Sequence, residues 1–261
     1  MTIFLHELRR SRLPLIIWGY AISFMLGVSI LIYPEMSSQM EEMSTMFADM
    51  GAFTSAFGMD QLNFGEFMGY FGVECGNVLG LGGALFAAIV GASALAKEER
   101  EGTAEFLLTH PLTRRRIVTE KLLAVLSQIL LLNGAVIGIS CACMAIVKVD
   151  AEASTLVLLF VAYLIMQIEI AAVTFGLSAF LRHGELGIGL GLAFVLYFLN
   201  ILSNLTEKLE FLKFITPFGY ADGAYIVPEK ALEIPYLAVG LGIGVLGIVA
   251  AYWKYTKKDI M

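Results

Sequence analysis

The sequence predicts an all-α integral membrane protein with six transmembrane helices in a single domain, residues 1–261. Of its residues, 58% are apolar and 15% are charged, and the mean hydropathy is +0.80, outside the range of water-soluble domains. Apolar runs of about 20 residues, long enough to cross a bilayer, recur along the chain. They cover residues 13–33, 70–96, 119–147, 155–181, 186–205 and 235–254. The segments between them leave no room for a separate soluble domain.

Residues 1–12 are expected to form a short helix on the inner membrane surface, and Pro14 marks the point where a spanning helix takes over. One face of this helix would meet lipid and the other would meet water and phosphate. The first face holds Ile3, Phe4, Leu5 and Leu8, and the second holds His6, Arg9 and Arg10. No small-residue cleavage site follows the first apolar run, so we expect this span to be retained rather than removed as a signal peptide.

The distribution of basic residues predicts the orientation, because cytoplasmic loops retain Lys and Arg during insertion. With the N-terminus inside, all but four of the 17 Lys and Arg residues lie in cytoplasmic segments. The four exceptions are Lys148, Lys208, Lys213 and Lys230. We therefore expect a multi-pass protein of the plasma membrane with both termini cytoplasmic. The net charge of −6 reflects acidic outer segments, and it predicts no nucleic-acid partner.

The outer segment 34–69 contains no Lys or Arg and is too long for a simple turn. Large apolar residues recur in it at the period of one helical face, which predicts an amphipathic outer helix. These residues are Met36, Met40, Met43, Phe47 and Met50. The methionine face would either close over an apolar substrate or pack on the outer ends of neighbouring spans.

The outer segment 206–234 alternates charged residues with aromatic ones. Aromatic side chains are typical of the membrane interface. This segment is therefore expected either to re-enter the outer leaflet or to lie flat on the membrane as a helix.

The second span carries a small residue at every fourth position, which strips one helical face of side chains and lets another helix approach closely. The positions are Gly72, Gly76, Gly80, Ala84, Ala88, Ala92 and Ala96. The partner at this interface is either another span of the same chain or a second copy.

Two acidic residues are predicted inside the membrane, Glu169 near the middle of the fourth span and Glu74 near the outer end of the second. A carboxyl at this depth is costly, so Glu169 is a candidate for the translocation pathway. Alternatively, Glu169 is neutral and hydrogen-bonded to a neighbouring span through Gln128 or Gln167. Glu74 would alternatively be an interfacial residue. Near the outer end of the fifth span, Asn200 and Asn204 would line an exit path.

The cysteines and histidines predict neither a disulfide framework nor a metal site. Cys75, Cys141 and Cys143 are expected to be small buried residues. His6, His110 and His183 all fall at the cytoplasmic edge, so a metal at bilayer depth would lack ligands. This disfavours an intramembrane enzyme. An ion-conducting channel is a further alternative, but the spans hold few polar residues besides Glu169.

The charged segment between the second and third spans is predicted to form an elbow of two helices. Thr103 would cap the first helix, Pro111 would stop it, and Thr113 would cap the next. A solvated hairpin explains two features poorly: the apolar run Phe106, Leu107 and Leu108, and the arginines Arg114, Arg115 and Arg116, which oppose the dipole of a helix N-terminus. Docking into a partner's groove would explain the first. Lipid phosphates or acidic partner residues would explain the second.

This segment resembles the signature of ABC-2 type transporter permeases. The matching residues are Glu98, Gly102, Thr103, Glu105, Leu107, Leu108, Pro111, Arg114, Ile117 and Lys121. The resemblance extends over the whole chain, including the six spans and the long first outer loop. It implies that 97–118 is the coupling region, whose coupling helix fits a cleft in a cytoplasmic ABC ATPase, with Glu98, Glu101 and Glu105 engaging that partner. It further implies export and an assembly of two permeases with two ATPase subunits.

The chain lacks the Gly-x-x-x-x-Gly-Lys-Ser/Thr phosphate loop, so we expect ATP and Mg²⁺ on the partner ATPase and no cofactor or enzymatic activity in this subunit. The compact, apolar chain suggests an amphipathic or apolar cargo, such as an antimicrobial peptide or a drug. Membrane lipid surrounds the spans.

Overall fold

The computed structural model describes residues 2–49, 51, 54, 56, 61–97, 113–181 and 186–257. Every regular element within these ranges is a helix. Six stretches are long and apolar enough to cross a membrane, as the sequence predicted. They are Arg12–Ser37 in α2 (Arg12–Asp49), Phe67–Ser93 over α4 (Phe67–Cys75), η1 (Gly76–Leu81) and α5 (Gly82–Ser93), α8 (Arg114–Val147), α9 (Ala153–Ser178), α10 (Leu186–Leu205) and α12 (Ile234–Lys257). The protein is an all-α integral membrane protein.

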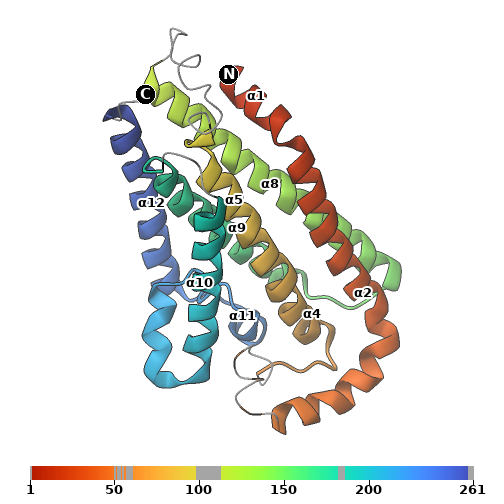
Figure 1. Cartoon of the computed structure of the whole chain (residues 1–261). Coiled ribbons are helices and arrows are strands. Elements are labelled where there is room, and N and C mark those ends of the chain that lie inside the picture. The colour runs from red at the N-terminus through yellow and green to blue at the C-terminus, as the bar shows by residue number, and fades with distance from the viewer. Residues whose placement is uncertain are drawn as a thin grey trace.

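The spans run back and forth along one bundle, so that α1 and the last turn of α12 lie at the same end (Figure 1). We call this the termini end and the opposite one the distal end. The central helix is α9, which packs against α5 and α12, while α2 packs against α8. Residues 169–172 of α9 are all buried, so every face of that helix is covered there. Large apolar side chains on α2, α8, α10 and α12 remain exposed, as expected for surfaces that meet lipid.

The small-residue face of the second span meets other helices of the same chain. A side chain added at Gly80 would contact Tyr163 of α9, and one added at Gly72 would contact Val227. Further along the face, Ala88 and Ala92 lie against Gly189 of α10. Of the two partners that the sequence allowed, the structure places spans of this chain on the face, because close backbone approach is what these residues permit.

The N-terminal helix α1 (Thr2–Arg10) continues almost directly into α2. The Ser11 amide donates to the Glu7 carbonyl (2.9 Å), and the Leu15 amide donates to the Ser11 carbonyl (3.0 Å). The expected lipid-facing position of Ile3 is wrong, because this side chain is only 8% exposed in a helix that packs on α8. Leu5 is exposed. A location of α1 on a membrane surface stays a prediction.

The helix predicted in the outer segment 34–69 is a continuation of the first span, because α2 runs on to Asp49. It bends in its distal part (Figure 1). Pro34 lies inside α2 and lacks the amide hydrogen that would bond to the preceding turn, which accounts for a bend. The side chains of Met40, Met43, Phe47 and Met50 lie outside the described residues, so both roles proposed for the methionine face stay predictions.

The chain between α10 and α12 forms two short helices, η2 (Glu207–Phe214) and α11 (Gly223–Glu229), and folds back along α10. The Thr216 hydroxyl donates to the Leu196 carbonyl at the middle of α10 (2.8 Å). Tyr220 reaches still further, to α9. The segment therefore returns toward the centre of the bundle, while its depth in a bilayer stays a prediction.

Candidate functional site

The coupling region lies largely outside the described residues. This applies to Glu98, Glu101, Gly102, Thr103, Glu105, Leu107, Leu108 and Pro111. The structure does describe Lys97 at its start and residues 113–118 at its end. The Thr113 hydroxyl accepts a hydrogen bond from the Arg116 amide (3.4 Å), which confirms the predicted helix cap.

The arginines that open α8 have partners within the chain. The Arg114 guanidinium donates to the carbonyl of Tyr255 in the last turn of α12 (3.5 Å), where the helix dipole favours a cation. Arg116 Nε donates to Glu120 Oε1, one turn along α8 (2.9 Å). From the sequence, lipid phosphates or acidic residues of a second protein were the expected partners of these arginines. For Arg114 and Arg116 that expectation was incomplete, because groups from other turns and helices converge on them.

A buried ionic contact connects Lys97, at the start of the coupling region, with Lys121, just beyond its end, through Glu7. Lys121 of α8 is 1% exposed, and its Nζ donates to Glu7 Oε1 (3.2 Å) and to the Ala94 carbonyl (2.7 Å). Lys97, beyond α5, pairs with the other oxygen of Glu7 (3.5 Å). Burial opposes ionisation of Glu7, but the two lysines outweigh it and hold the pKa of this carboxyl below its usual value. We call Glu7, Lys97 and Lys121 the lysine bridge.

A second contact fixes the start of α1 to α8. Glu120 Oε2 accepts hydrogen bonds from the backbone amides of Ile3 (3.0 Å) and Phe4 (3.2 Å). A carboxylate at a helix N-terminus satisfies free amides and opposes the positive end of the helix dipole. Through Glu120 and Glu7, α1 is therefore attached to α8 near both of its ends.

Glu169 is buried in α9, and the hydroxyl of Tyr220 donates to its Oε2 (2.7 Å). The carboxyl lies against Gly240 of α12, where an added Cβ would overlap it. The partners named from the sequence were wrong. Gln167 bonds instead to Asn133 and to the Leu79 carbonyl, and Gln128 bonds to the Ala124 carbonyl. The aromatic, glycine-containing segment 206–234 was the available signal, because re-entry was one of the two arrangements that its composition allowed.

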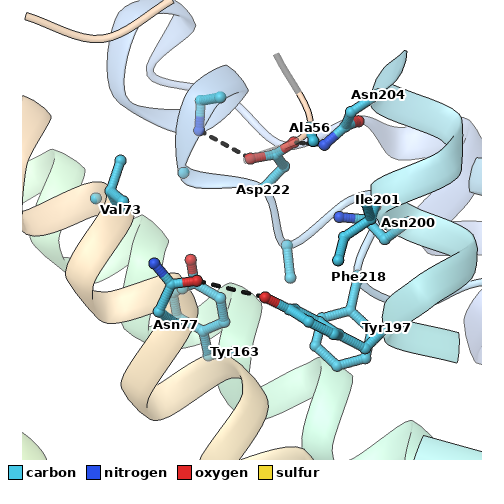
Figure 2. A pocket seen from close by; sticks show the side chains of 15 residues that line it. Ala56, Val73, Asn77, Tyr163, Tyr197, Asn200, Ile201, Asn204, Phe218 and Asp222 are labelled. Atoms are coloured by element: carbon cyan, nitrogen blue, oxygen red, sulfur yellow. Dashed lines mark hydrogen bonds between the residues drawn. The ribbon is translucent and has the colours of Figure 1, made fainter. Parts of the chain in front are cut away.

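Asn200 lines a polar cavity of about 50 Å³ in the distal half of the bundle. Figure 2 shows Asn77 and Tyr163 on one side and Tyr197, Asn200 and Asn204 on the other, with Asp222 near Asn204. The lining comes from α4, η1, α9, α10 and α11, together with Ala56 and residues 218, 221 and 222. We call it the distal cavity. The sequence suggested Asn200 and Asn204 but missed the tyrosines and Asp222, which are distant in the chain.

The three pathway candidates do not meet at one place. Glu74 of α4 is half-buried near Ser29 of α2 and is absent from the cavity lining. Glu169 lies against α12, and Asn200 faces the distal cavity. The structure therefore separates a carboxyl–hydroxyl pair from a hydrogen-bonding cavity, where sequence reasoning treated the three residues as one set.

The cysteines are all free, and only Cys75 is buried, whereas Cys141 is exposed and Cys143 is intermediate. The expectation that all three are buried was wrong, because Cys141 lies on a side of α8 that no other helix covers. Across the described ranges, no group of three or more His, Cys, Asp or Glu side chains could hold a metal ion.

The whole-chain comparison agrees with this architecture. The family model for the ABC-2 family transporter protein matches residues 1–260. The chain belongs to the ABC-2 transporter family. Comparison with curated proteins gives no match.

ABC-2 family permeases are in general the non-enzymatic membrane subunits of ABC transporters, working with an ABC ATPase in a dimeric arrangement. In this ABC-2 member, the lysine bridge and the Glu120 contact lie at the termini end, beside the coupling region. Glu169 and the distal cavity lie further along the bundle. The polar groups of the site are thus divided between a joint at one end and a cavity near the other.

Proposed function

We propose that this chain is the membrane-spanning subunit of an ABC exporter and that a separate cytoplasmic ATPase drives it by docking on the coupling region, 97–118. The observation that carries the proposal is the lysine bridge. Lys97 and Lys121 lie on opposite sides of the coupling segment and share the carboxylate of Glu7. A displacement of the segment would therefore act on α5, α8 and α1 together.

The division of labour follows from the chemistry that the chain carries. ATP and Mg²⁺ would bind to the partner ATPase, since the sequence has no phosphate loop, and no cofactor is assigned to the permease itself. With the termini cytoplasmic, nucleotide-driven closure of two ATPase subunits would move the coupling regions of two permeases. Rigid helices such as α8 would carry that movement to the distal half, where cargo leaves outward.

The cargo is proposed to be amphipathic or apolar, such as an antimicrobial peptide or a drug, because the chain is compact and its spans are predominantly apolar. Deleting the gene and exposing the cells to a panel of such compounds tests this. Increased sensitivity to at least one of them is expected, and unchanged sensitivity to all would contradict the cargo class without affecting the permease assignment.

The decisive experiment uses charge reversal in the coupling region. We expect the full chain to copurify with a soluble ATPase, and Glu98→Lys or Glu101→Lys to separate ATP hydrolysis from transport in reconstituted vesicles. Glu229→Lys is the matched control, because Glu229 is exposed at the end of α11, remote from the coupling region. Transport by the purified chain without any ATPase would overturn the proposal.

A further inference from the structure

The distal cavity contains buried polar atoms that have no partner. Tyr163 and Asn200 both line it, and the Tyr163 hydroxyl and Asn200 Oδ1 make no hydrogen bond to any described group. Tyr163 is only 1% exposed. A buried polar atom without a partner costs free energy, so such atoms occur where a water, an ion or a ligand completes them. Two of them at one cavity indicate a site for a bound polar group.

The backbone at this cavity is also unusual. The helix that contributes Gly76 and Asn77 changes there from α-helical to π-helical, over Gly76–Leu81. The π-helical turn is rare and is frequent at functional sites. Gly76 also brings its backbone close to Tyr163, since an added Cβ would lie 3.1 Å from the Tyr163 hydroxyl. The tyrosine is thereby held at the cavity wall by the shape of the second span.

The groups around the cavity favour a cationic hydrogen-bond donor. Asn200 Oδ1 can only accept, and Asn77 Oδ1 accepts from the Tyr197 hydroxyl (3.5 Å). The carboxylate of Asp222 is held in place by the Ala224 amide (2.9 Å) and by Asn204 (3.4 Å). None of the described lining residues is basic.

The aromatic rings at the cavity and the charge of segment 34–69 support the same preference. The rings of Tyr197 and Phe218 pack edge to face at the cavity, with centroids 5.4 Å apart, and the faces of such rings attract cations. Segment 34–69, whose Ala56 contributes to the lining, contains no Lys or Arg anywhere in its sequence.

We propose that the distal cavity binds a primary ammonium group, with Asn200 Oδ1 and the Tyr163 hydroxyl as hydrogen-bond acceptors and the Asp222 carboxylate as the nearby negative charge. A cavity of about 50 Å³ has room for several water-sized groups, and therefore for a small ammonium group. The group belongs either to a free small amine or to the head group of an aminophospholipid. The inference deepens the proposed export function and rests on it, because it names a chemical group of the cargo.

The test is equilibrium binding of radiolabelled methylammonium to the detergent-purified full chain at neutral pH. Saturable binding is expected, with competition by unlabelled methylammonium but not by tetramethylammonium, which has no N–H group to donate, nor by sodium. The variant Asn200→Leu should weaken binding about tenfold, as expected for one lost hydrogen bond to a charged group. Tyr163→Phe should weaken it by a smaller factor.

The matched control is Tyr252→Phe, which removes a hydroxyl bonded to Thr119 at the termini end and should leave the affinity unchanged. Thermal unfolding of each variant verifies that it is folded. The proposal is overturned if binding is not saturable, if tetramethylammonium or sodium competes as well as methylammonium, or if both cavity variants bind normally. The binding experiment needs no ATPase. A negative result there would leave the permease assignment intact, and a negative charge-reversal experiment would leave this binding site intact.

A second arm identifies the source of the amine. Native mass spectrometry of the full chain would compare retention of phosphatidylethanolamine with that of phosphatidylcholine. Preferential retention of phosphatidylethanolamine that falls in Asn200→Leu supports the site and assigns it to a lipid head group. Equal retention of both lipids, together with methylammonium binding, supports the site and assigns it to a free amine.

Discussion

The lysine bridge and the distal cavity differ in how their polar groups are paired. Glu7, Glu120 and Lys121 are buried at the termini end, and each meets oppositely charged or hydrogen-bonding groups from another helix. At the distal cavity, the Tyr163 hydroxyl and Asn200 Oδ1 are buried and have no partner among the described residues. Paired charges hold helices together, whereas an unpaired buried polar group is stabilised only when a further molecule binds to it. The difference matches the two proposed roles, which are transmission of movement at the lysine bridge and binding at the distal cavity.

The largest effect is expected from breaking the joint. Glu7→Gln would remove the carboxylate that the buried Lys121 shares with Lys97, and losing one partner of a buried ion pair costs about 3–5 kcal/mol. Thermal unfolding in detergent measures this loss. Glu152→Gln is the control, because the Glu152–Lys230 pair is exposed and its loss should change the unfolding temperature little. Equal effects of the two variants would remove the basis for calling the lysine bridge a joint.

The same joint predicts a pH dependence. Because the folded pKa of Glu7 lies below its usual value of 4.5, its contribution to stability is complete above that value. It is lost as the pH falls through the lower folded pKa. The native chain should therefore lose stability relative to Glu7→Gln in this acidic range, measured as the difference between their unfolding temperatures at each pH. A constant difference across the range would contradict the assignment.

A smaller loss of stability is expected in the region between the two ends, where the Glu169 carboxyl lies against α12. Gly240→Ala would place a methyl group against the Glu169 carboxyl, and overpacking of this kind costs about 1–3 kcal/mol. Gly242→Ala is closely matched, since nothing lies within 4 Å of its added Cβ. We expect Gly240→Ala to lower the thermal unfolding temperature and Gly242→Ala to leave it unchanged. A stable Gly240→Ala would mean that α9 and α12 pack less tightly here.

The helix cap beside the coupling region should matter less. Thr113→Ala removes the hydrogen bond to the Arg116 amide, and loss of such a cap costs about 0.5–2 kcal/mol. Thr206 precedes η2 without capping it, so Thr206→Ala serves as the comparison and should have almost no effect. Hydrogen exchange of the first turn of α8 would locate the loss. Unchanged protection in Thr113→Ala would show that tertiary contacts alone hold this turn.

The smallest effect on stability is expected at the distal cavity. Asn200→Leu removes an unpartnered acceptor, Asn200 Oδ1, so the free energy of unfolding should stay the same or rise. Thermal unfolding measures this beside the binding experiment. A clear loss of stability would mean that Asn200 has a structural role, and the contrast between the two ends would then weaken.

Elements with a local cause could be predicted from the sequence. The six spans follow from runs of apolar residues, and the cap at Thr113 follows from one residue before a helix. The coupling motif indicated the ABC-2 family before any contact was known, and the family model agrees. The helix beyond the first span was likewise foreseen from its periodicity, although not that it continues α2.

Which polar groups meet could not be predicted from the sequence, because their contacts form between distant helices. Glu169 finds Tyr220 at a separation of 51 residues, and Lys121 finds Glu7 at a separation of 114. The distal cavity likewise draws its walls from several helices that are remote along the chain. Hydropathy and helical periodicity act within a few turns of a helix, so they fix where spans begin and end. Which face one span presents to another depends on how small and large side chains fit across the whole bundle. No local pattern encodes that fit.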